Sequence, residues 1–85
     1  MHKILFTKQA HKTLQRMPRS TAQHIRQKIE LLARDPYAPS PNVRKLKGQP
    51  GHRLRVGDWR IIYEIRKDEL IILILKIAPR GEVYK

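Results

Sequence analysis

The sequence predicts an α+β domain: an N-terminal strand and an antiparallel pair of helices, then a twisted antiparallel sheet with both helices on one face. Three observations predict this fold class. Apolar residues recur with helical spacing between residues 7 and 35, polar and apolar residues alternate strictly over residues 53–56, and Gly57-Asp58 is typical of a two-residue hairpin turn. Since 85 residues suit one small domain, we assign residues 1–85 to a single domain.

The first predicted strand covers the short apolar stretch of residues 2–6, and Thr7 marks the start of the first helix. Over the next ten positions, apolar residues recur at i, i+4 and i+7 with polar residues between them, as on one face of an amphipathic helix. These apolar residues are Ala10, Leu14 and Met17. Pro18 lacks an amide hydrogen, so it ends this helix.

A second helix is predicted to begin at Ser20, because Ser20 and Gln23 have the spacing of a capping box. Asp35-Pro36 ends this helix. The break between the helices is short, so they are expected to pack as an antiparallel pair. The predicted buried face of the second helix consists of Ala22, Ile25, Ile29, Leu32 and Ala33.

Residues 35–50 contain four prolines and have no periodicity, so they are interpreted as a long loop of the kind that often carries function. Three strands follow, over residues 53–56, 59–65 and 70–77. The last of these is apolar on both sides except at Lys76, which is typical of a central strand covered on both faces.

The hairpin predicts a cluster of arginines. With Gly57-Asp58 as a type II′ turn, Arg55 lies opposite Arg60, and Arg53 lies on the same side of the sheet. The apolar residues of both strands then point toward the helices. Like charges about 5 Å apart cost stability, which favours a function for the cluster over a merely soluble surface. Glu64, on the same face, is the acid available to neutralise part of it.

Further basic residues are expected beside this cluster. Lys76 joins the same face if the turn after Ile65 has an odd number of residues, and otherwise it would point into the core. Arg80 follows the last strand and Tyr84 lies four residues later, while Lys45 and Lys47 border the face from the preceding loop. Arginine clusters bind phosphate, and a tyrosine can stack on an unpaired base.

The charge of the chain indicates an anionic partner. Nineteen Lys and Arg residues against seven Asp and Glu give a net charge of +12. Such an imbalance is costly unless a polyanion or an acidic protein relieves it, and a nucleic acid is the favoured partner. The longest apolar run, residues 70–75, is far shorter than the roughly 20 residues that span a bilayer. The opening residues are too short an apolar run for a signal peptide, so a cytoplasmic protein without a membrane partner is expected.

The residue types also limit the chemistry. No cysteine is present, the four histidines lack a chelating spacing, and no glycine-rich phosphate loop occurs, so neither a metal nor another cofactor is predicted. The available groups are Arg, Lys, Tyr and His side chains, which suit RNA. RNA carries its own nucleophile, the 2′-hydroxyl, and needs only proton transfer and stabilisation of a negatively charged phosphorane.

Two stretches carry a resemblance to a known family. They are residues 45–65, which include RLRVGDWRIIYEI, and the ending APRGEVYK, residues 78–85. Together with the order of elements, these stretches resemble the RelE/ParE superfamily of type II toxin–antitoxin toxins over essentially the whole chain. The resemblance implies a RelE-like fold. RelE-like members enter the ribosomal A site and cleave messenger RNA, leaving a 2′,3′-cyclic phosphate, whereas ParE-like members inhibit DNA gyrase and generally lack the catalytic basic set.

The resemblance assigns catalytic positions to this chain by motif, and all of them hold plausible residues, which favours the RelE-like branch. These positions are Arg53, Arg55, Arg60, Arg80 and Tyr84. We expect Arg55 and Arg60 to stabilise the phosphorane, Arg80 to neutralise or protonate the leaving 5′-oxygen, and Tyr84 to stack on the target base. The expected RNA-binding residues are Lys45, Lys47, His52 and Lys76.

Two departures from the RelE-like pattern concern the general base. Lysine is common where this chain has Arg53 and Arg55, and many relatives have a histidine where this chain has Pro79. Arginine is a poor base because its pKa lies above 12. Deprotonation of the 2′-hydroxyl is therefore expected from Tyr84, with its pKa lowered by the arginines, or from His52.

The resemblance also implies partners and leaves two rival functions. The partners are a cognate antitoxin, messenger RNA in the ribosomal A site, and the ribosome with its 16S rRNA. One rival is a ParE-like inhibitor of DNA gyrase, and the other is a catalytically inactive relative that binds only RNA or its antitoxin.

Overall fold

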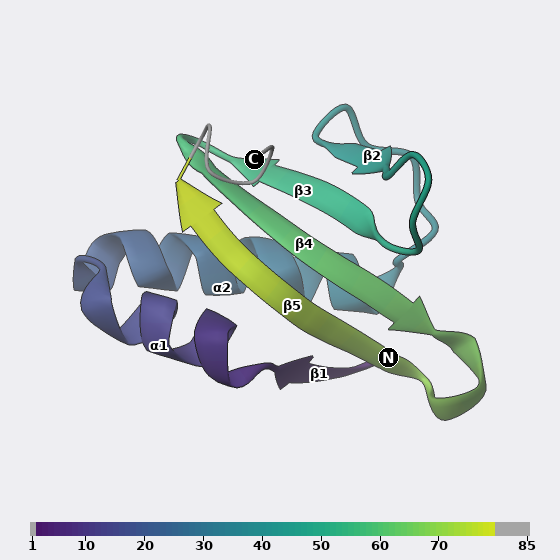
Figure 1. Ribbon diagram of the computed structural model, residues 1–85, viewed down its shortest axis with the longest axis horizontal. Helices are drawn as coiled ribbons and strands as arrows, with labels where there is room; N and C mark the ends of the chain where they lie inside the picture. Colours follow the sequence, from purple (N-terminus) through teal and green to yellow (C-terminus); the bar gives the residue numbers. More distant parts are fainter. Residues whose placement is uncertain (1, 80–85) are drawn as a thin grey trace.

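The computed structural model describes residues 2–79, which form a five-stranded sheet with two helices on one face (Figure 1). The strand order is β1-β5-β4-β3-β2. No helix within this described part is long and apolar enough to cross a membrane. The elements are β1 (Lys3–Phe6), α1 (Lys8–Arg16), α2 (Arg19–Arg34), β2 (Val43–Lys45), β3 (His52–Val56), β4 (Trp59–Arg66), the 3-10 helix η1 (Lys67–Glu69) and β5 (Ile71–Pro79).

The core lies between the sheet and the helices, and the predicted helical stripes are confirmed. Helix α1 begins after Thr7, whose hydroxyl oxygen accepts a hydrogen bond from the amide of Ala10 at 3.3 Å. The stripes of both helices meet apolar side chains of β3, β4 and β5. Burying each large aliphatic side chain contributes about 1.5–3 kcal/mol. The fully buried large side chains are Tyr63, Ile25, Ile29, Ile61, Ile72, Ile74 and Ile77.

The predicted capping box is wrong. Helix α2 begins at Arg19 with Pro18 as its N-cap, and no side chain caps it. Only Met17 and Pro18 separate the two helices. Pro18 already has an extended backbone, with φ −54° and ψ 142°, and its carbonyl accepts the first helical bond from Ala22 at 3.0 Å. The helix therefore starts one residue before Ser20 can act as a cap.

The predicted hairpin register is confirmed. Arg55 pairs with Arg60, Arg53 with Ile62, and Val56 with Trp59. Gly57 has φ 58°, and among the described residues Leu70 is the only non-glycine with a positive φ. A positive φ at the first turn residue alone fits a type II′ turn. Because a two-residue turn fixes which residues lie opposite each other, the face of each hairpin side chain followed from the sequence.

The rest of the sheet differs from the prediction in two ways. The loop of residues 35–50 contains a short strand, β2, which pairs antiparallel with β3. Strand β1 pairs with β5 in parallel, so the sheet is mixed and its antiparallel part comprises β2 to β5. Parallel pairing is possible here because α1 and α2 lie in the connection between β1 and the later strands.

Lys76 lies on the predicted face, but for a different reason. Four residues separate Arg66 from its partner Ile71, and this even number alone would place Lys76 opposite Ile61, on the core side. A bulge corrects the register: Tyr63 pairs with Ile74 whereas Ile62 pairs with Lys76, which leaves Leu75 as the extra residue.

The start of α1 secures this bulge. The hydroxyl of Thr7 donates a hydrogen bond to the carbonyl of Leu75 at 2.7 Å. The Gln9 amide group bonds both backbone groups of Ile77, accepting from its N–H at 3.2 Å and donating to its carbonyl at 3.3 Å. Side chains thus replace a strand along the edge of β5 beyond the end of β1, and satisfy backbone groups that pairing would otherwise satisfy.

Candidate functional site

Four arginines line one recess on the face of the sheet that points away from the helices. Arg53 and Arg55 lie on β3, Arg60 lies on β4, and Arg44 lies on β2. Pro41 and Asn42 complete the lining, and the recess has a volume of about 100 Å³. We call it the arginine recess. The sequence predicted three of its four cations.

The side chain of Arg60 is buried and held by hydrogen bonds. It is only 7 % exposed, and it is the only charged residue among the buried side chains of the described chain. Its Nη1 donates hydrogen bonds to the carbonyls of Trp59 at 3.1 Å and Gly57 at 3.4 Å, both at the hairpin turn. A buried guanidinium held by backbone carbonyls stabilises a negative charge strongly, because little reorganisation is needed when that charge arrives.

Arg55 is exposed, and Asn42 orients it. The backbone N–H of Arg55 donates to the Asn42 carbonyl at 2.8 Å, and Nη2 of Arg55 donates to Oδ1 of Asn42 at 3.5 Å. Ser40 holds Asn42 in turn, since the hydroxyl oxygen of Ser40 accepts a hydrogen bond from the backbone N–H of Asn42 at 3.2 Å. The loop before β2 therefore forms one wall of the arginine recess.

Arg44 and Asn42 are the site residues that the sequence analysis missed. Arg44 lies directly opposite Arg53 and so shares its face of the sheet. The signal was weak, because β2 is three residues long and lies within a proline-rich loop. Only the pairing with β3 makes Val43–Lys45 a strand, and such non-local pairing leaves no periodicity in a stretch this short.

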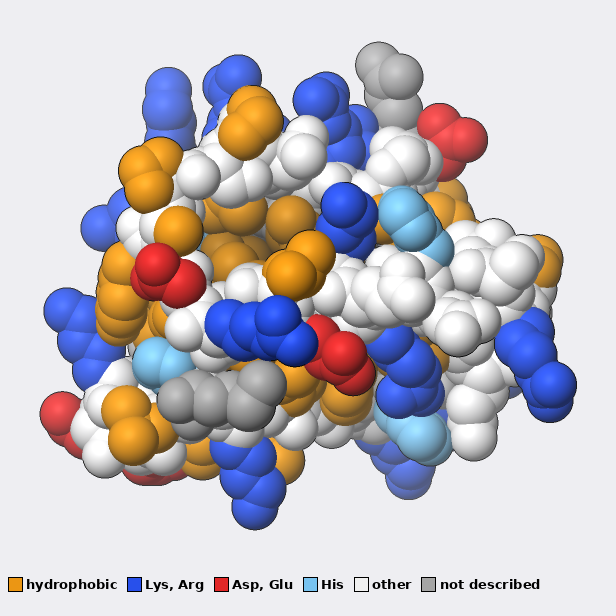
Figure 2. Space-filling model, turned by 180° about the vertical axis from the view of Figure 1, so that it is seen from behind, with side chains coloured by type: hydrophobic (Ala, Val, Ile, Leu, Met, Phe, Trp, Pro, Cys, Tyr) orange, Lys and Arg blue, Asp and Glu red, His pale blue; other side chains and the backbone are white. Residues whose placement is uncertain are grey.

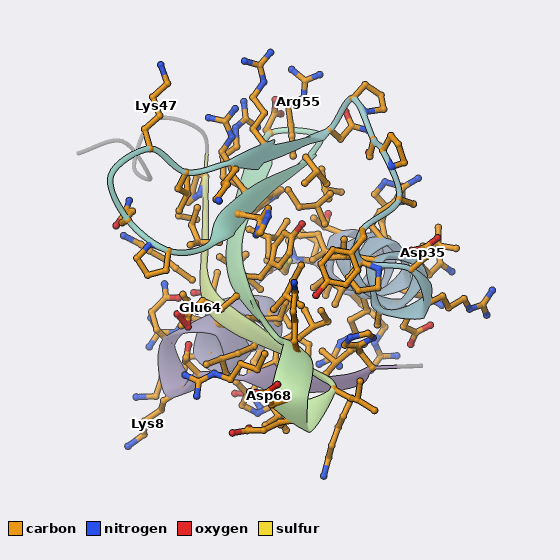
Figure 3. All side chains as sticks on the ribbon, turned by 90° about the vertical axis from the view of Figure 1, so that its right-hand side faces the viewer. Lys8, Asp35, Lys47, Arg55, Glu64 and Asp68 are labelled. Atoms are coloured by element: carbon orange, nitrogen blue, oxygen red, sulfur yellow. The ribbon has the colours of Figure 1, made fainter. Side chains whose placement is uncertain are left out.

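Glu64, the acid available on the face of the arginines, lies beside another cation, Arg66. A carboxylate oxygen of Glu64 lies 3.6 Å from Nη2 of Arg66 on the same strand. In Figure 3, Glu64, Asp35 and Asp68 all lie well away from Arg55. Positive charge is nevertheless not confined to the arginine recess, since Figure 2 shows Lys and Arg side chains projecting around the opposite face as well.

His52 and Lys45 lie on the helix side of the sheet, away from the arginine recess. His52 pairs with Lys45 on one neighbouring strand and with Tyr63 on the other, and its ring stacks on Tyr63 with centroids 5.3 Å apart. Burial, and secondly the charge of Lys45, lower the pKa of His52 below its usual 6.5. A neutral imidazole could accept a proton, but here it faces the wrong side to receive one from a substrate in the arginine recess.

Tyr63 anchors the far side of this stack. Its side chain is fully buried, and burial raises its pKa to about 12. Its hydroxyl has no hydrogen-bond partner among residues 2–79. Tyr63 is therefore a neutral core residue that positions the ring of His52, and not a proton donor for the arginine recess.

The remaining predicted residues divide into three groups. Lys76 is exposed opposite Ile62, on the face that carries the arginines. Lys47 is exposed in the loop between β2 and β3, and it projects away from Arg55 in Figure 3. Arg80 and Tyr84 lie outside the described residues.

The arginine recess is suited to holding a phosphate group. Guanidinium groups offer paired N–H donors that match the oxygens of a phosphodiester. No group of three or more His, Asp or Glu side chains gathers within residues 2–79. The described part of the site therefore offers positive charge and N–H donors to a phosphate group.

Comparison with known proteins gives a consistent family. The family of ParE toxins of type II toxin–antitoxin systems, parDE, matches residues 4–84. A protein of Methanocaldococcus jannaschii designated toxin RelE1 is 32 % identical over 80 residues, which is 92 % of this chain and 89 % of that protein.

Solved structures agree with this comparison. In the archaeal RelE–RelB complex from Pyrococcus horikoshii OT3, one chain is 32 % identical to this one and superposes with a TM-score of 0.75, covering 95 % of this chain and 97 % of that chain. The isolated Escherichia coli RelE toxin gives a TM-score of 0.81 at 17 % identity, covering 99 % of this chain and 92 % of the other, and so supports the α+β fold alone. The chain is therefore a RelE-like toxin that belongs to the ParE toxin family of type II toxin–antitoxin systems, within the RelE/ParE superfamily.

Proposed function

We propose that this toxin is a metal-independent endoribonuclease that cleaves messenger RNA in the ribosomal A site of the cytoplasm. The observation that carries the proposal is the arginine recess, where Arg44, Arg53, Arg55 and Arg60 converge in about 100 Å³ on the side of the sheet away from the helices. A nuclease that uses the 2′-hydroxyl of its substrate needs such concentrated positive charge around one phosphate.

The proposed reaction uses arginines of the arginine recess together with residues near the end of the sequence. The 2′-hydroxyl loses its proton and its oxygen attacks phosphorus, while the P–O5′ bond breaks. The products are a 2′,3′-cyclic phosphate and a free 5′-hydroxyl, which gains a proton. Arg55 and Arg60 stabilise the phosphorane, and Arg80 neutralises or protonates the leaving oxygen.

Tyr84 is the preferred candidate for the base. Sequence reasoning left this role to Tyr84 or His52, and His52 lies on the other side of the sheet, stacked on Tyr63. We therefore assign one of two roles to Tyr84. It either accepts the proton of the 2′-hydroxyl or stacks on the nucleobase at the cleavage site. Lys76 shares the arginine face and contributes to binding of the strand.

An antitoxin is the proposed regulatory partner. The Pyrococcus relative was solved as a RelE–RelB complex, and a net charge of +12 suits an acidic or amphipathic segment that covers the basic surface. Since RNA and antitoxin would compete for the same cations, binding of the antitoxin would silence cleavage.

Cleavage of messenger RNA on programmed ribosomes tests the proposal, with cut sites mapped by primer extension. Removing one electrostatic stabiliser costs about 10²–10³ in rate, and removing a general acid or base costs about 10²–10⁴. We therefore expect losses of that order in Arg55→Ala, Arg80→Ala and Tyr84→Phe. Lys8→Ala is the control, because Figure 3 places Lys8 at the opposite end of the molecule from Arg55. Unchanged cleavage in both Arg80→Ala and Tyr84→Phe would remove the mechanism.

Inhibition of DNA gyrase is the second candidate, because the family that matches residues 4–84 is described by its ParE members. Expressing the toxin without an antitoxin and assaying both gyrase-linked DNA breaks and cut transcripts separates the two functions. DNA breaks without cut transcripts would favour gyrase. Absence of growth arrest would indicate an inactive relative.

A further inference from the structure

A second recess adjoins the arginine recess at the end of the hairpin. It has a volume of about 380 Å³ and is lined by Asn42, Arg55, Arg60, Val56 and Gly57 together with two residues of α2, His24 and Lys28. Asn42, Arg55 and Arg60 line both recesses. The two recesses are thus neighbours that share these three side chains, and the second one reaches from the hairpin to α2.

Helix α2 fixes the backbone position of Lys28 at the rim of the second recess. His24 and Lys28 are one helical turn apart, so they share one face of α2 and are both exposed. On the neighbouring face, Ile25 and Ile29 are fully buried in the core and fix the rotation of the helix. Glu30 is the only acid in α2, and at a spacing of two residues it does not face Lys28.

The residues that the two recesses share are also constrained. Nη1 of Arg60 is bonded to the carbonyls of Gly57 and Trp59, and Arg55 is bonded to Asn42 through both its backbone and its side chain. Beyond the two shared arginines, the second recess contains one further lysine, Lys28, so a strand bound in the arginine recess would meet this cation next on the side of α2. The arginines of the first recess and Lys28 in the second form a row of cations. The successive phosphates of an RNA backbone are negative groups at regular intervals, and so fit such a row.

We propose that the recess between α2 and the β3–β4 hairpin binds the phosphate adjacent to the scissile phosphate, with Lys28 as its ligand. The proposal rests on the proposed function, since it takes the arginine recess as the place of the scissile phosphate. The proposal adds a second phosphate subsite, beside α2, to the one on the sheet. The substrate is then a single strand in which two consecutive phosphates contact the protein.

Binding of short, uncleavable oligonucleotides tests the subsite. The probe is a fluorescent trinucleotide with 2′-O-methyl groups on every ribose and two internal phosphates, titrated at low salt. Two further probes carry a neutral methylphosphonate at one or the other internal position. Lys28→Gln removes the charge while keeping a side chain with similar helix propensity. Lys8→Gln is the matched control, because it removes one exposed helical lysine far from Arg55.

Lys28→Gln should weaken binding of the unmodified trinucleotide about two- to fivefold at low salt. It should also reduce the slope of log Kd against log salt by about 0.7, the value for one phosphate contact on a single strand. One of the two methylphosphonate probes should bind wild type and Lys28→Gln equally well, since the neutral group has already removed the contact. Lys8→Gln should bind all three probes like wild type.

Several results would overturn the subsite. These are an equal loss in Lys28→Gln with all three probes, no loss relative to Lys8→Gln, or no binding of the trinucleotide to wild type at low salt. Weaker binding of an acidic antitoxin peptide to Lys28→Gln, with unchanged oligonucleotide binding, would assign the recess to that partner instead.

The failure of this subsite and the failure of the nuclease can be told apart. A protein that binds the probes in a Lys28-dependent way but leaves messenger RNA intact on the ribosome would retain the subsite and lose the proposed activity. A protein that cuts messenger RNA while Lys28→Gln weakens all three probes equally would retain the activity and lose the subsite.

Discussion

Arg55 and Arg60 lie directly opposite each other across the β3–β4 hairpin, yet Arg55 is exposed whereas Arg60 is only 7 % exposed. The two guanidinium groups therefore have different surroundings despite their pairing. Arg60 is bonded to backbone carbonyls of the hairpin turn, and Arg55 is bonded to Asn42 at the surface.

This asymmetry predicts unequal effects of the two arginines on stability. Arg60→Met should lower the free energy of unfolding by about 1–3 kcal/mol, because the carbonyls of Gly57 and Trp59 lose a charged donor. Arg55→Met should change it by less than about 0.5 kcal/mol, since the side chain is exposed and its removal relieves a like-charge pair. Urea denaturation of both variants measures the difference, and equal effects would contradict the asymmetry.

The turn before β3 depends on Gly51. This residue has φ 113°, and a Cβ added there would lie 3.1 Å from the backbone carbonyl oxygen of Tyr63. Gly51→Ala should therefore lower the melting temperature more than Gly48→Ala, where φ is 73° and a Cβ would meet nothing within 4 Å. We expect a cost of about 1 kcal/mol from backbone strain at Gly48, and more at Gly51, in thermal unfolding. A larger loss in Gly48→Ala would show that the contact with Tyr63 is unimportant.

The edge of β5 depends on Gln9. Gln9→Ala removes two hydrogen bonds to the backbone of Ile77 and should cost about 1–2 kcal/mol. Hydrogen exchange of the Ile77 amide should accelerate more than that of Ile72, whose strand partner on that edge is β1. Gln15→Ala, an exposed glutamine on the same helix, is the control and should leave both amides unchanged. Uniform acceleration in Gln9→Ala would indicate only global destabilisation.

His52 gives the fold a dependence on pH. Its pKa in the folded state is below 6.5, so as the pH falls the unfolded state binds the proton first. The stability gained from a neutral His52 is present above pH 6.5 and is lost as the pH falls through the lower, folded pKa. Between pH 7.5 and 5, wild type should lose more unfolding free energy than His52→Phe, which keeps a ring against Tyr63. Parallel curves for the two proteins would exclude His52 as the cause.

The hairpin could be predicted from the sequence because a two-residue turn fixes the pairing of everything beside it. The placement of Arg53, Arg55 and Arg60 on one face followed from Gly57-Asp58 alone. The features that were missed are non-local. Strand β2, and with it Arg44, is defined by its pairing with β3, and β1 reaches β5 across more than sixty residues of sequence.

Two local expectations also failed for physical reasons. The capping box at Ser20 matched a spacing pattern, but Pro18 already supplies the extended residue from which the helix starts. His52 and Lys45 do not lie beside the arginines, because alternation along β3 sends His52 to the side opposite Arg53, and Lys45 of β2 pairs with His52.

The unpaired Leu75 puts the two halves of β5 out of phase with each other. Inserting or deleting one residue elsewhere in β5 would exchange the inner and outer surfaces for the positions between that change and Pro79. A substitution changes one side chain, whereas a single-residue deletion in β5 before Lys76 would also turn Lys76 away from the face that carries the arginines. The number of residues in β5 therefore helps to decide which side chains accompany the arginines on this face, just as the identity of each residue does.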